Sequence, residues 1–296
     1  MTVVEILLIG GAHGPKLDQA LNKAANQEDL DLVRLILTHH KQVGAGADDA
    51  IENAAVRGDF SILSSLMAQT SDVNISTRAH QKLTDHKSVL KIKSGLACAV
   101  VLLEQGVEQW SIDKALVDIV HDTVKTDVCQ EYINKLLGHA ANVNALQGQS
   151  VQIAAGQGNG RLFAQLVCAG ASSRTVTRAL PLLLVSGMDE EELFALMRMC
   201  FGRTGHAPSV GVDSNSESNE PMVYLSLLSY PNGQRILEFL LEHHYDVQWT
   251  RRRTLDKQAG EEEVNALIWA HSSEDQRPLS AEVVELLVKH GEPKAY

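Results

Sequence analysis

The sequence is poor in aromatic residues and cysteines, and it contains no long apolar run. Aromatics make up 4% of the chain, which argues against β-sandwiches and barrels, since these rely on aromatic and β-branched residues. No apolar stretch reaches the roughly 18 residues of a membrane span. The 26 basic residues are outnumbered by 37 acidic ones, for a net charge of -11 without a basic stripe. This balance argues against nucleic-acid and anionic-membrane partners.

The four cysteines, Cys98, Cys129, Cys168 and Cys200, are widely spaced and form no C-x-x-C motif. A disulfide framework needs denser spacing in a smaller chain. Because each cysteine lies among apolar residues, the sequence predicts buried and inert thiols. The N-terminus has no basic region before its apolar run, so the sequence does not predict a signal peptide. These features favour an intracellular protein, cytoplasmic rather than nuclear.

What the sequence does contain is a repeat. Segments 20–29, 50–59 and 150–159 align without gaps, with apolar residues at i, i+3 and i+4 on one face of a short helix. Weaker copies begin at residues 115 and 266. A second, wider apolar motif recurs at 32–37, 236–241 and 283–288, and each copy ends at a short polar or glycine-containing stop. The stops recur roughly every 33 residues, the period of a helix–turn–helix solenoid.

The pattern A-L-x-x-A-A-x-x-G-D, then L-V-x-L-L-L, then G-A-D-V-N resembles the ankyrin repeat, most closely at residues 136–145. The resemblance covers residues 3–293, but the T-P-L-H opening of a consensus repeat is absent. Alanine-rich arrays without T-P-L-H are similar to those of large fungal ankyrin proteins. The resemblance implies an all-α, ankyrin-type α-solenoid of about seven to eight stacked helix–turn–helix repeats. It implies a single array over residues 1–296, with the third and sixth pairs least regular.

Two insertions interrupt the predicted array. Residues 202–221 are rich in Ser, Asn and acidic residues and are expected to form a flexible loop. Residues 250–263 carry opposed runs, Arg251–Arg253 and Glu261–Glu263, and are expected to form a long charged finger. The arginines suggest either an anion or nuclear-import patch or a solvated finger.

The ends lack the polar caps that repeat arrays normally need. The chain is expected to begin inside a second helix, at residues 3–9, and to end just after one, at 283–290. Two alternatives follow: a larger fungal parent has been shortened, or a partner covers the ends. Self-association through uncapped ends is then expected.

No motif indicates catalytic residues, a cofactor or a metal. The glycines after Ile9 and those at 156–160 lack a dinucleotide or P-loop pattern and fit helix ends and turns better. Four histidines, His39, His139, His243 and His290, each stand two places before a repeat marker. They are expected in the last turn of the second helices, where a partly positive side chain meets the negative helix end.

Two functions remain open. The first is a non-catalytic protein–protein interaction scaffold or regulatory adaptor. The second is an accessory protein or cryptic enzyme in a fungal biosynthetic, secondary-metabolite pathway. For the scaffold, the predicted binding residues are the three tryptophans Trp110, Trp249 and Trp269 and the acidic residues Asp48, Asp49, Asp72, Glu108 and Asp246.

The tryptophans carry the partner prediction. Trp110 and Trp249 are expected in fingers, and Trp269 on a first helix facing the groove. Exposed tryptophans often anchor interfaces; alternatively, each ring packs under a neighbouring finger. The flanking acidic residues predict a basic peptide, extended or helical, whose binding is sensitive to salt.

Overall fold

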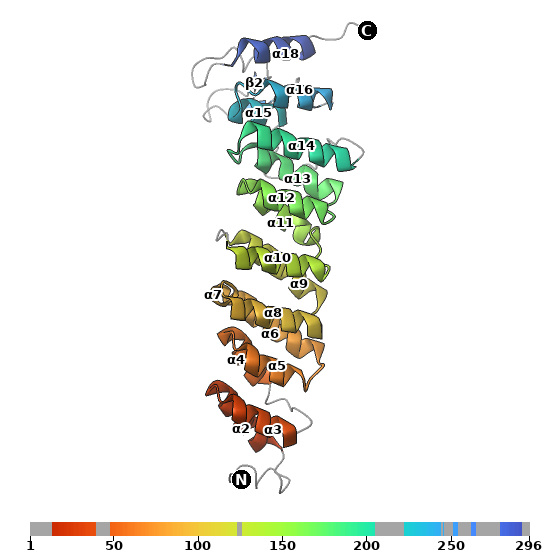
Figure 1. Ribbon diagram of the computed structural model, residues 1–296. Helices are drawn as coiled ribbons and strands as arrows, with labels where there is room; N and C mark the ends of the chain where they lie inside the picture. Colours follow the sequence, from red (N-terminus) through yellow and green to blue (C-terminus); the bar gives the residue numbers. More distant parts are fainter. Residues whose placement is uncertain are drawn as a thin grey trace. The chain divides into compact units, whose positions relative to one another are not determined.

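The computed structural model describes residues 14–39, 48–122, 126–204, 222–243, 245, 251–253, 262–264 and 279–291. The chain divides into two compact units, residues 1–146 and 147–296 (Figure 1). The helices of unit 1 are α2 (Pro15–Asn26), α3 (Leu30–His39), α4 (Asp48–Arg57), α5 (Phe60–Met67), α6 (Val73–Asp85), α7 (Lys87–Leu90), α8 (Lys93–Gln105), α9 (Gln109–His121) and α10 (Asp127–Gly138).

A short 3-10 helix, η2 (Ala145–Gly148), lies at the division. Unit 2 contains α11 (Gln149–Gly156), α12 (Gly160–Cys168), α13 (Ser173–Leu184), α14 (Glu190–Thr204), α15 (Met222–Ser229), α16 (Gln234–Glu242) and α18 (Ala281–Gly291), with strands β1 (Arg251–Arg253) and β2 (Glu262–Val264).

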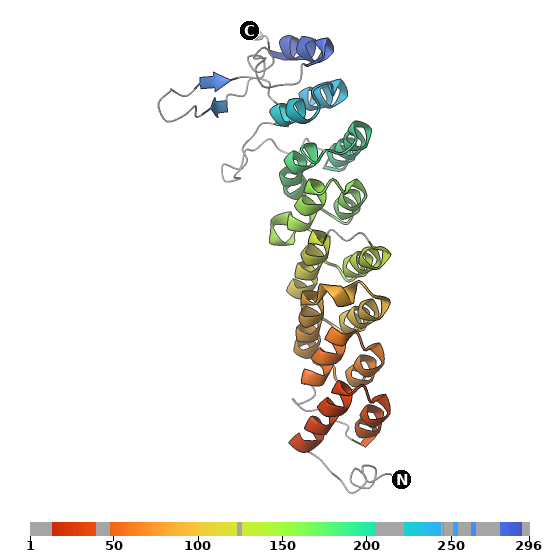
Figure 2. The same ribbon diagram turned by 90° about the vertical axis from the view of Figure 1, so that its left-hand side faces the viewer.

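The helices of each unit form consecutive pairs arranged in two layers (Figure 2). In unit 1 the first helices α2, α4, α6 and α9 pack on one another in order, and so do the second helices α3, α5, α8 and α10. In unit 2, α11, α13 and α15 form one layer, and α12, α14, α16 and α18 form the other. The chain therefore has a helical-repeat fold, as the sequence predicted.

The turn inside a pair follows one local rule. A residue in the left-handed region precedes a side chain that caps the second helix: Glu28–Asp29, Gly58–Asp59 and Gly158–Asn159. Asp59 Oδ1 accepts a hydrogen bond from the Ile62 amide at 3.1 Å, and Asn159 Oδ1 accepts one from Leu162 at 3.2 Å. Such caps satisfy amides that have no partner inside the helix.

The alanines of the repeat motif lie in the core. They are at most 1% exposed: Ala24, Ala25, Ala54, Ala55, Ala154 and Ala155. Small side chains at these positions allow neighbouring helices to approach closely, and this expectation is confirmed. The apolar residues of the second helices complete the core, with Val33, Ile62 and Ile236 at most 1% exposed.

The third and sixth pairs depart from the regular pattern, as predicted. The third contains the extra helix α7, which crowds Gly95: a Cβ there would collide with the Val89 carbonyl. The sixth has Pro181 inside α13 and a 15-residue α14.

One predicted boundary was wrong. The loop expected from residue 202 begins later, because α14 continues to Thr204, and residues 205–221 lie outside the described residues. Within the predicted charged finger, β1 and β2 pair antiparallel, with Arg252 opposite Glu263 and Arg253 opposite Glu262. The fold is therefore all-α, as predicted, with one short β-hairpin between α16 and α18. The helix expected at residues 3–9 also lies outside the described residues.

The predicted fingers between repeats are short turns where they are described. The linkers 68–72, 106–108 and 169–172 contain three to five residues and no strand. The linker between α10 and α11 is longer and includes η2, and the two units divide within it.

The helix-end histidines follow the predicted register. His39 and His290 lie in the last turns of α3 and α18, and His139 and His243 are the C-cap residues of α10 and α16. His243 Nδ1 lies 2.7 Å from the Phe239 carbonyl oxygen, so the ring satisfies a carbonyl at the end of its helix. The other three histidines share this place at a helix end.

Candidate interaction surface

The first helices of unit 1 are joined by polar contacts one repeat apart. Arg57 on α4 donates to the Asn26 carbonyl and side chain on α2, at 3.3 and 3.2 Å. The Lys114 ammonium on α9 lies 3.5 Å from Asp85 Oδ1 on α6. The residues in these contacts are separated by 29 to 31 positions, which is one repeat. The polar face of the first helices is thus largely engaged in holding neighbouring repeats together.

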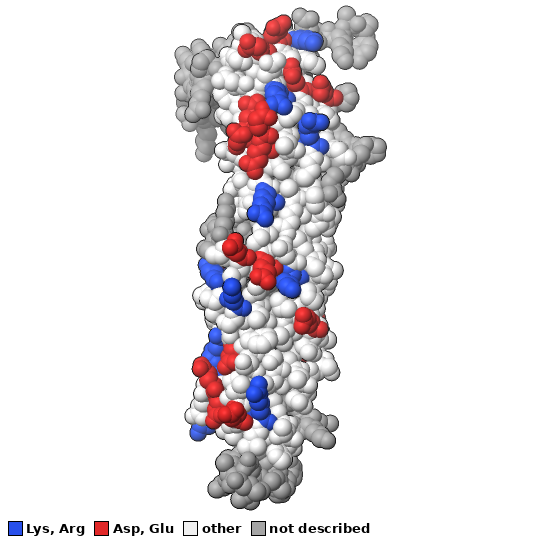
Figure 3. All heavy atoms as spheres, in the orientation of Figure 1, with Lys and Arg blue, Asp and Glu red and all other residues white. Residues whose placement is uncertain are grey.

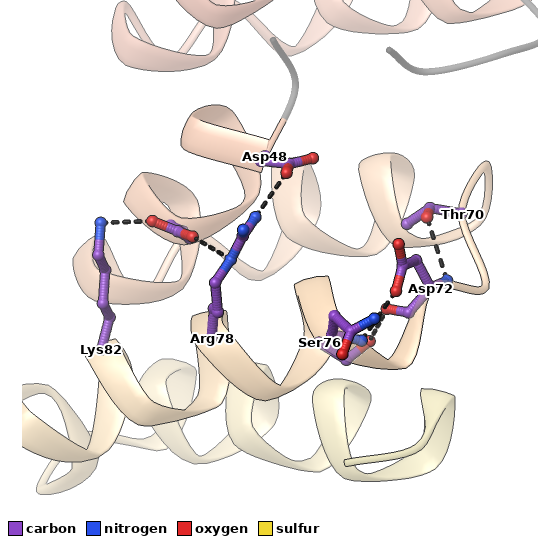
Figure 4. Close-up of polar contacts among 8 residues, drawn as sticks. Asp48, Thr70, Asp72, Ser76, Arg78 and Lys82 are labelled. Atoms are coloured by element: carbon purple, nitrogen blue, oxygen red, sulfur yellow. Dashed lines mark hydrogen bonds and ion pairs between the residues drawn. The ribbon is translucent and has the colours of Figure 1, made fainter. Parts of the chain in front are cut away.

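The densest of these contacts surrounds Glu52 on α4 (Figure 4). Its carboxylate, only 7% exposed, accepts from Arg78 Nε at 3.1 Å and from the Lys82 ammonium. Arg78 also pairs with Asp48, and that hydrogen bond raises the pKa of Arg78. Asp48, a predicted binding residue, is therefore committed to the contact between α4 and α6, while Asp49 beside it is exposed.

Asp72 also has a structural role. It is the N-cap of α6, and its Oδ1 accepts from the Asn74 amide at 2.8 Å (Figure 4). Its own amide donates to Thr70 Oγ1 at 3.3 Å, and its carbonyl accepts from Ser76 Oγ at 3.3 Å. A carboxylate at a helix N-terminus is favoured by the helix dipole whether or not a partner binds.

Trp110 is placed differently from the prediction. It lies in the first turn of α9, not in a finger, and it is 49% exposed, so it does not pack beneath a finger. Its indole N–H donates to the Glu108 carboxylate. The Glu108 amide donates in turn to Thr77 Oγ1 on α6 at 3.0 Å, which ties the start of α9 to the neighbouring repeat.

Val73 lies on the same edge of unit 1. It is the first residue of α6 and is 43% exposed. It lies beside Gly106, because a Cβ atom added to that glycine would be 3.6 Å from Val73 Cγ2. We call Asp72, Val73, Glu108 and Trp110 the α6–α9 edge. It combines a half-exposed indole, an exposed valine and two carboxylates on adjacent repeats.

The other predicted binding residues, Trp249, Trp269 and Asp246, lie outside the described residues. On the face drawn in Figure 3, acidic and basic side chains are interspersed over unit 1, whereas in unit 2 acidic side chains gather over α14. The first turn of α14 contains three acidic residues, Glu190, Glu191 and Glu192.

A buried polar network was not anticipated from the sequence. His80 on α6 is fully buried, with Nδ1 3.0 Å from Ser111 Oγ on α9 and Nε2 2.9 Å from the Tyr132 hydroxyl on α10. Burial lowers the pKa of His80 to about 4, so the ring is neutral and can donate at one nitrogen and accept at the other. Ser111 and Tyr132 are at most 2% exposed. The arrangement resembles a nucleophile with its base, but no substrate can reach it, so its role is to fix three helices together.

The prediction of four buried thiols was wrong at Cys168. Cys98, Cys129 and Cys200 are buried, but Cys168 is exposed at the end of α12. Its apolar neighbours in sequence lie on the buried face of the helix, and the cysteine itself falls on the other face. All four cysteines are present as thiols.

Within the described residues, no three His, Cys, Asp or Glu side chains come together in a way that could hold a metal. Over the same residues, no helix combines the length and apolar character needed to cross a membrane. Comparison with known proteins adds no identity: no protein-family model matches the chain, and no curated protein is significantly similar to it.

Proposed function

We propose that the chain is a non-catalytic interaction module of degenerate ankyrin-type repeats, and that the α6–α9 edge binds a basic segment of a protein partner. The observation that carries the proposal is Trp110, a half-exposed indole whose N–H is held by the neighbouring carboxylate of Glu108. Exposed tryptophans are enriched among the residues that dominate binding energies.

The repeat assignment rests on two regularities. Bonds between neighbouring repeats join residues 27 to 32 positions apart, close to the ankyrin period. The turns inside the pairs place a left-handed residue before an Asp or Asn cap, where the ankyrin pattern has G-D. The described linkers 68–72, 106–108 and 169–172 are shorter than the fingers that the resemblance implies, so the proposed binding surface is built from helix starts.

The chemistry of the edge favours a cation. An arginine or lysine side chain can lie over the face of an indole, and the attraction increases when water is excluded. Glu108 stands beside the ring, and Asp72 adds a second carboxylate at the start of the neighbouring first helix. The exposed Val73 supplies apolar area for the stem of the basic side chain.

The test is binding of short fluorescent peptides, one rich in arginine and alanine, one in lysine and alanine, and one in glutamate and alanine. We expect the basic peptides to bind and the acidic one not to bind, with affinity falling as salt is raised. Trp110→Ala should weaken binding by at least roughly fivefold, equivalent to about 1 kcal/mol. Fluorescence anisotropy measures the affinity, and thermal unfolding checks that the variant is folded.

Two controls locate the site. Trp110→Phe keeps an aromatic face and should retain most of the affinity. Leu228→Ala removes an apolar residue of similar exposure (50%) from unit 2 and should have no effect. Binding that is unchanged in Trp110→Ala, or a loss of stability without a loss of affinity, would assign Trp110 to packing and refute the proposed surface.

A further inference from the structure

Two neighbouring second helices of unit 2 each carry a cysteine. Cys168 is the last residue of α12 and is exposed, whereas Cys200 lies on α14 and is fully buried. The two helices pack against each other. The residues are 32 positions apart, which matches the one-repeat spacing of the polar contacts in unit 1.

The packing register brings these two positions together. Gly148 faces Thr175 and Gly156 faces Leu182, so α11 and α13 run in the same direction. Because each of these helices is followed by a turn and the second helix of its pair, α12 and α14 also run in the same direction. At the start of α12, Gly160 has no side chain and lies against Glu192 and Leu196 of α14.

The same register applies at the other end of these helices. Cys168 follows Gly160 by eight residues, and Cys200 follows Glu192 by eight residues, so the register places the two cysteines at the same level along α12 and α14. Electrostatics agrees with this placement. Burial raises the pKa of Cys200 to about 12, and the charge of Cys168 contributes in the same direction.

We propose that Cys168 and Cys200 form an oxidative modification site, at which a hydroperoxide oxidises the exposed Cys168 and the resulting sulfenic acid condenses with Cys200 into an intrachain disulfide. This site lies in unit 2 and does not depend on the proposed peptide-binding edge of unit 1.

The chemistry balances in two steps. The Cys168 sulfur attacks one peroxide oxygen, the O–O bond breaks, and the thiol becomes a sulfenic acid as one water is released. The Cys200 sulfur then attacks the sulfenic sulfur, the S–O bond breaks, and a second water leaves with the Cys200 proton. The two thiols lose two electrons, and the peroxide gains them. Because burial disfavours the Cys200 thiolate, it slows the second step.

The disulfide would covalently join the fifth and sixth helix pairs. Such a bond restricts the opened states in which α12 and α14 separate. Oxidation is therefore expected to slow amide hydrogen exchange in these helices without changing exchange in unit 1.

The experiment treats the folded full-length chain with hydrogen peroxide, blocks the remaining thiols with iodoacetamide under denaturing conditions, and maps peptides without reduction. We expect one peptide pair joining Cys168 to Cys200, a chain that remains monomeric on a non-reducing gel, and recovery of both thiols with dithiothreitol. Cys98 and Cys129, buried in unit 1, should not be oxidised, so they should be recovered as alkylated thiols and serve as internal controls.

The matched variant is Cys168→Ser, which alters an exposed position and should fold normally. In this variant Cys200 should be recovered as alkylated thiol after the same treatment. The proposal is overturned if wild-type Cys168 ends only as sulfinic or sulfonic acid, if it links two chains, or if Cys200 stays alkylated after Cys168 is oxidised. Oxidation of Cys200 in Cys168→Ser to the wild-type extent would equally overturn it.

Discussion

The two units build the same helix-pair arrangement, and both have polar contacts between neighbouring pairs, but the contacts at the centre of each differ. Unit 1 uses polar side chains: Glu52 with Arg78 and Lys82 on its surface, and His80 with Ser111 and Tyr132 in its interior. Unit 2 places an aromatic cluster between α14 and α16, in which Phe201 lies 5.0 Å from Phe239 and 4.6 Å from His243, measured between ring centroids.

The comparison teaches that stacking of helix pairs requires complementary neighbours but not a particular chemistry. Edge-to-face contacts between phenylalanine rings, such as Phe201 and Phe239, are apolar and respond little to salt. A buried histidine and a shielded carboxylate respond to both salt and pH. The two units should therefore respond differently to changes in solution conditions, and each prediction below tests that difference by peptide-resolved hydrogen exchange.

The largest effect is expected from removing the centre of the aromatic cluster. Phe201 is 7% exposed and contacts Phe239, His243 and Tyr245. Phe201→Ala should lower the free energy of unfolding of unit 2 by roughly 3–5 kcal/mol. Exchange in α14 and α16 should accelerate at all salt concentrations, with no change in α4 or α6.

A matched phenylalanine provides the control. Phe60 is 43% exposed at the start of α5, and Phe60→Ala should change the stability of unit 1 by no more than about 0.5 kcal/mol. Equal losses from both variants would mean that the buried Phe201 ring stabilises unit 2 no more than the exposed Phe60 ring stabilises unit 1.

The second effect concerns acid. The pKa of His80 is lowered to about 4 by burial, against about 6.5 in an unfolded chain. Between these values the unfolded state binds a proton that the folded state does not, so stability falls as pH decreases from 6.5 to 4. The total loss is about 3 kcal/mol, confined to unit 1, and is present in full near pH 4.

His80→Gln should remove this part of the pH dependence, although it lowers stability at neutral pH because the partners Ser111 and Tyr132 lose their geometry. The exposed His86, whose Nδ1 lies 2.7 Å from the Lys82 carbonyl oxygen, is the control. If His86→Gln abolished the acid effect and His80→Gln preserved it, the buried network would not be its cause.

The smallest effect is expected at the ion pairs of the first helices. Glu52→Gln removes the charge that Arg78 and Lys82 share, and because both cations are about half exposed the cost should be only about 1 kcal/mol. The diagnostic feature is salt: the difference between wild type and variant should shrink as ionic strength rises. Asp85→Asn, at a more exposed pair with Lys114, should change stability less. A salt-independent loss at Glu52 would indicate packing rather than charge.

The sequence determined the local units of this protein. Alanines at fixed spacing predicted the close-packed first helices, and Ala54 and Ala154 are fully buried. Glycine followed by Asp or Asn predicted the turns at residues 58–59 and 158–159, because one residue adopts the left-handed conformation and the next caps a helix. Histidines at helix ends followed the same local logic. Each of these features depends on residues within one turn of one another, so it can be read from the order of residues alone.

The tertiary structure decided what depends on neighbours a repeat or more away. The pairing of Glu52 with Lys82, the meeting of His80 with Tyr132 across 52 positions, and the exposure of Cys168 all depend on how one helix pair is rotated against the next. That rotation is set by the packing of whole helix faces, to which every buried side chain contributes, and no single spacing in the sequence encodes it. For the same reason Trp110 was only predicted to be an anchor, from the rarity of tryptophan, whereas its place on α9 beside Glu108 emerged from the folded chain.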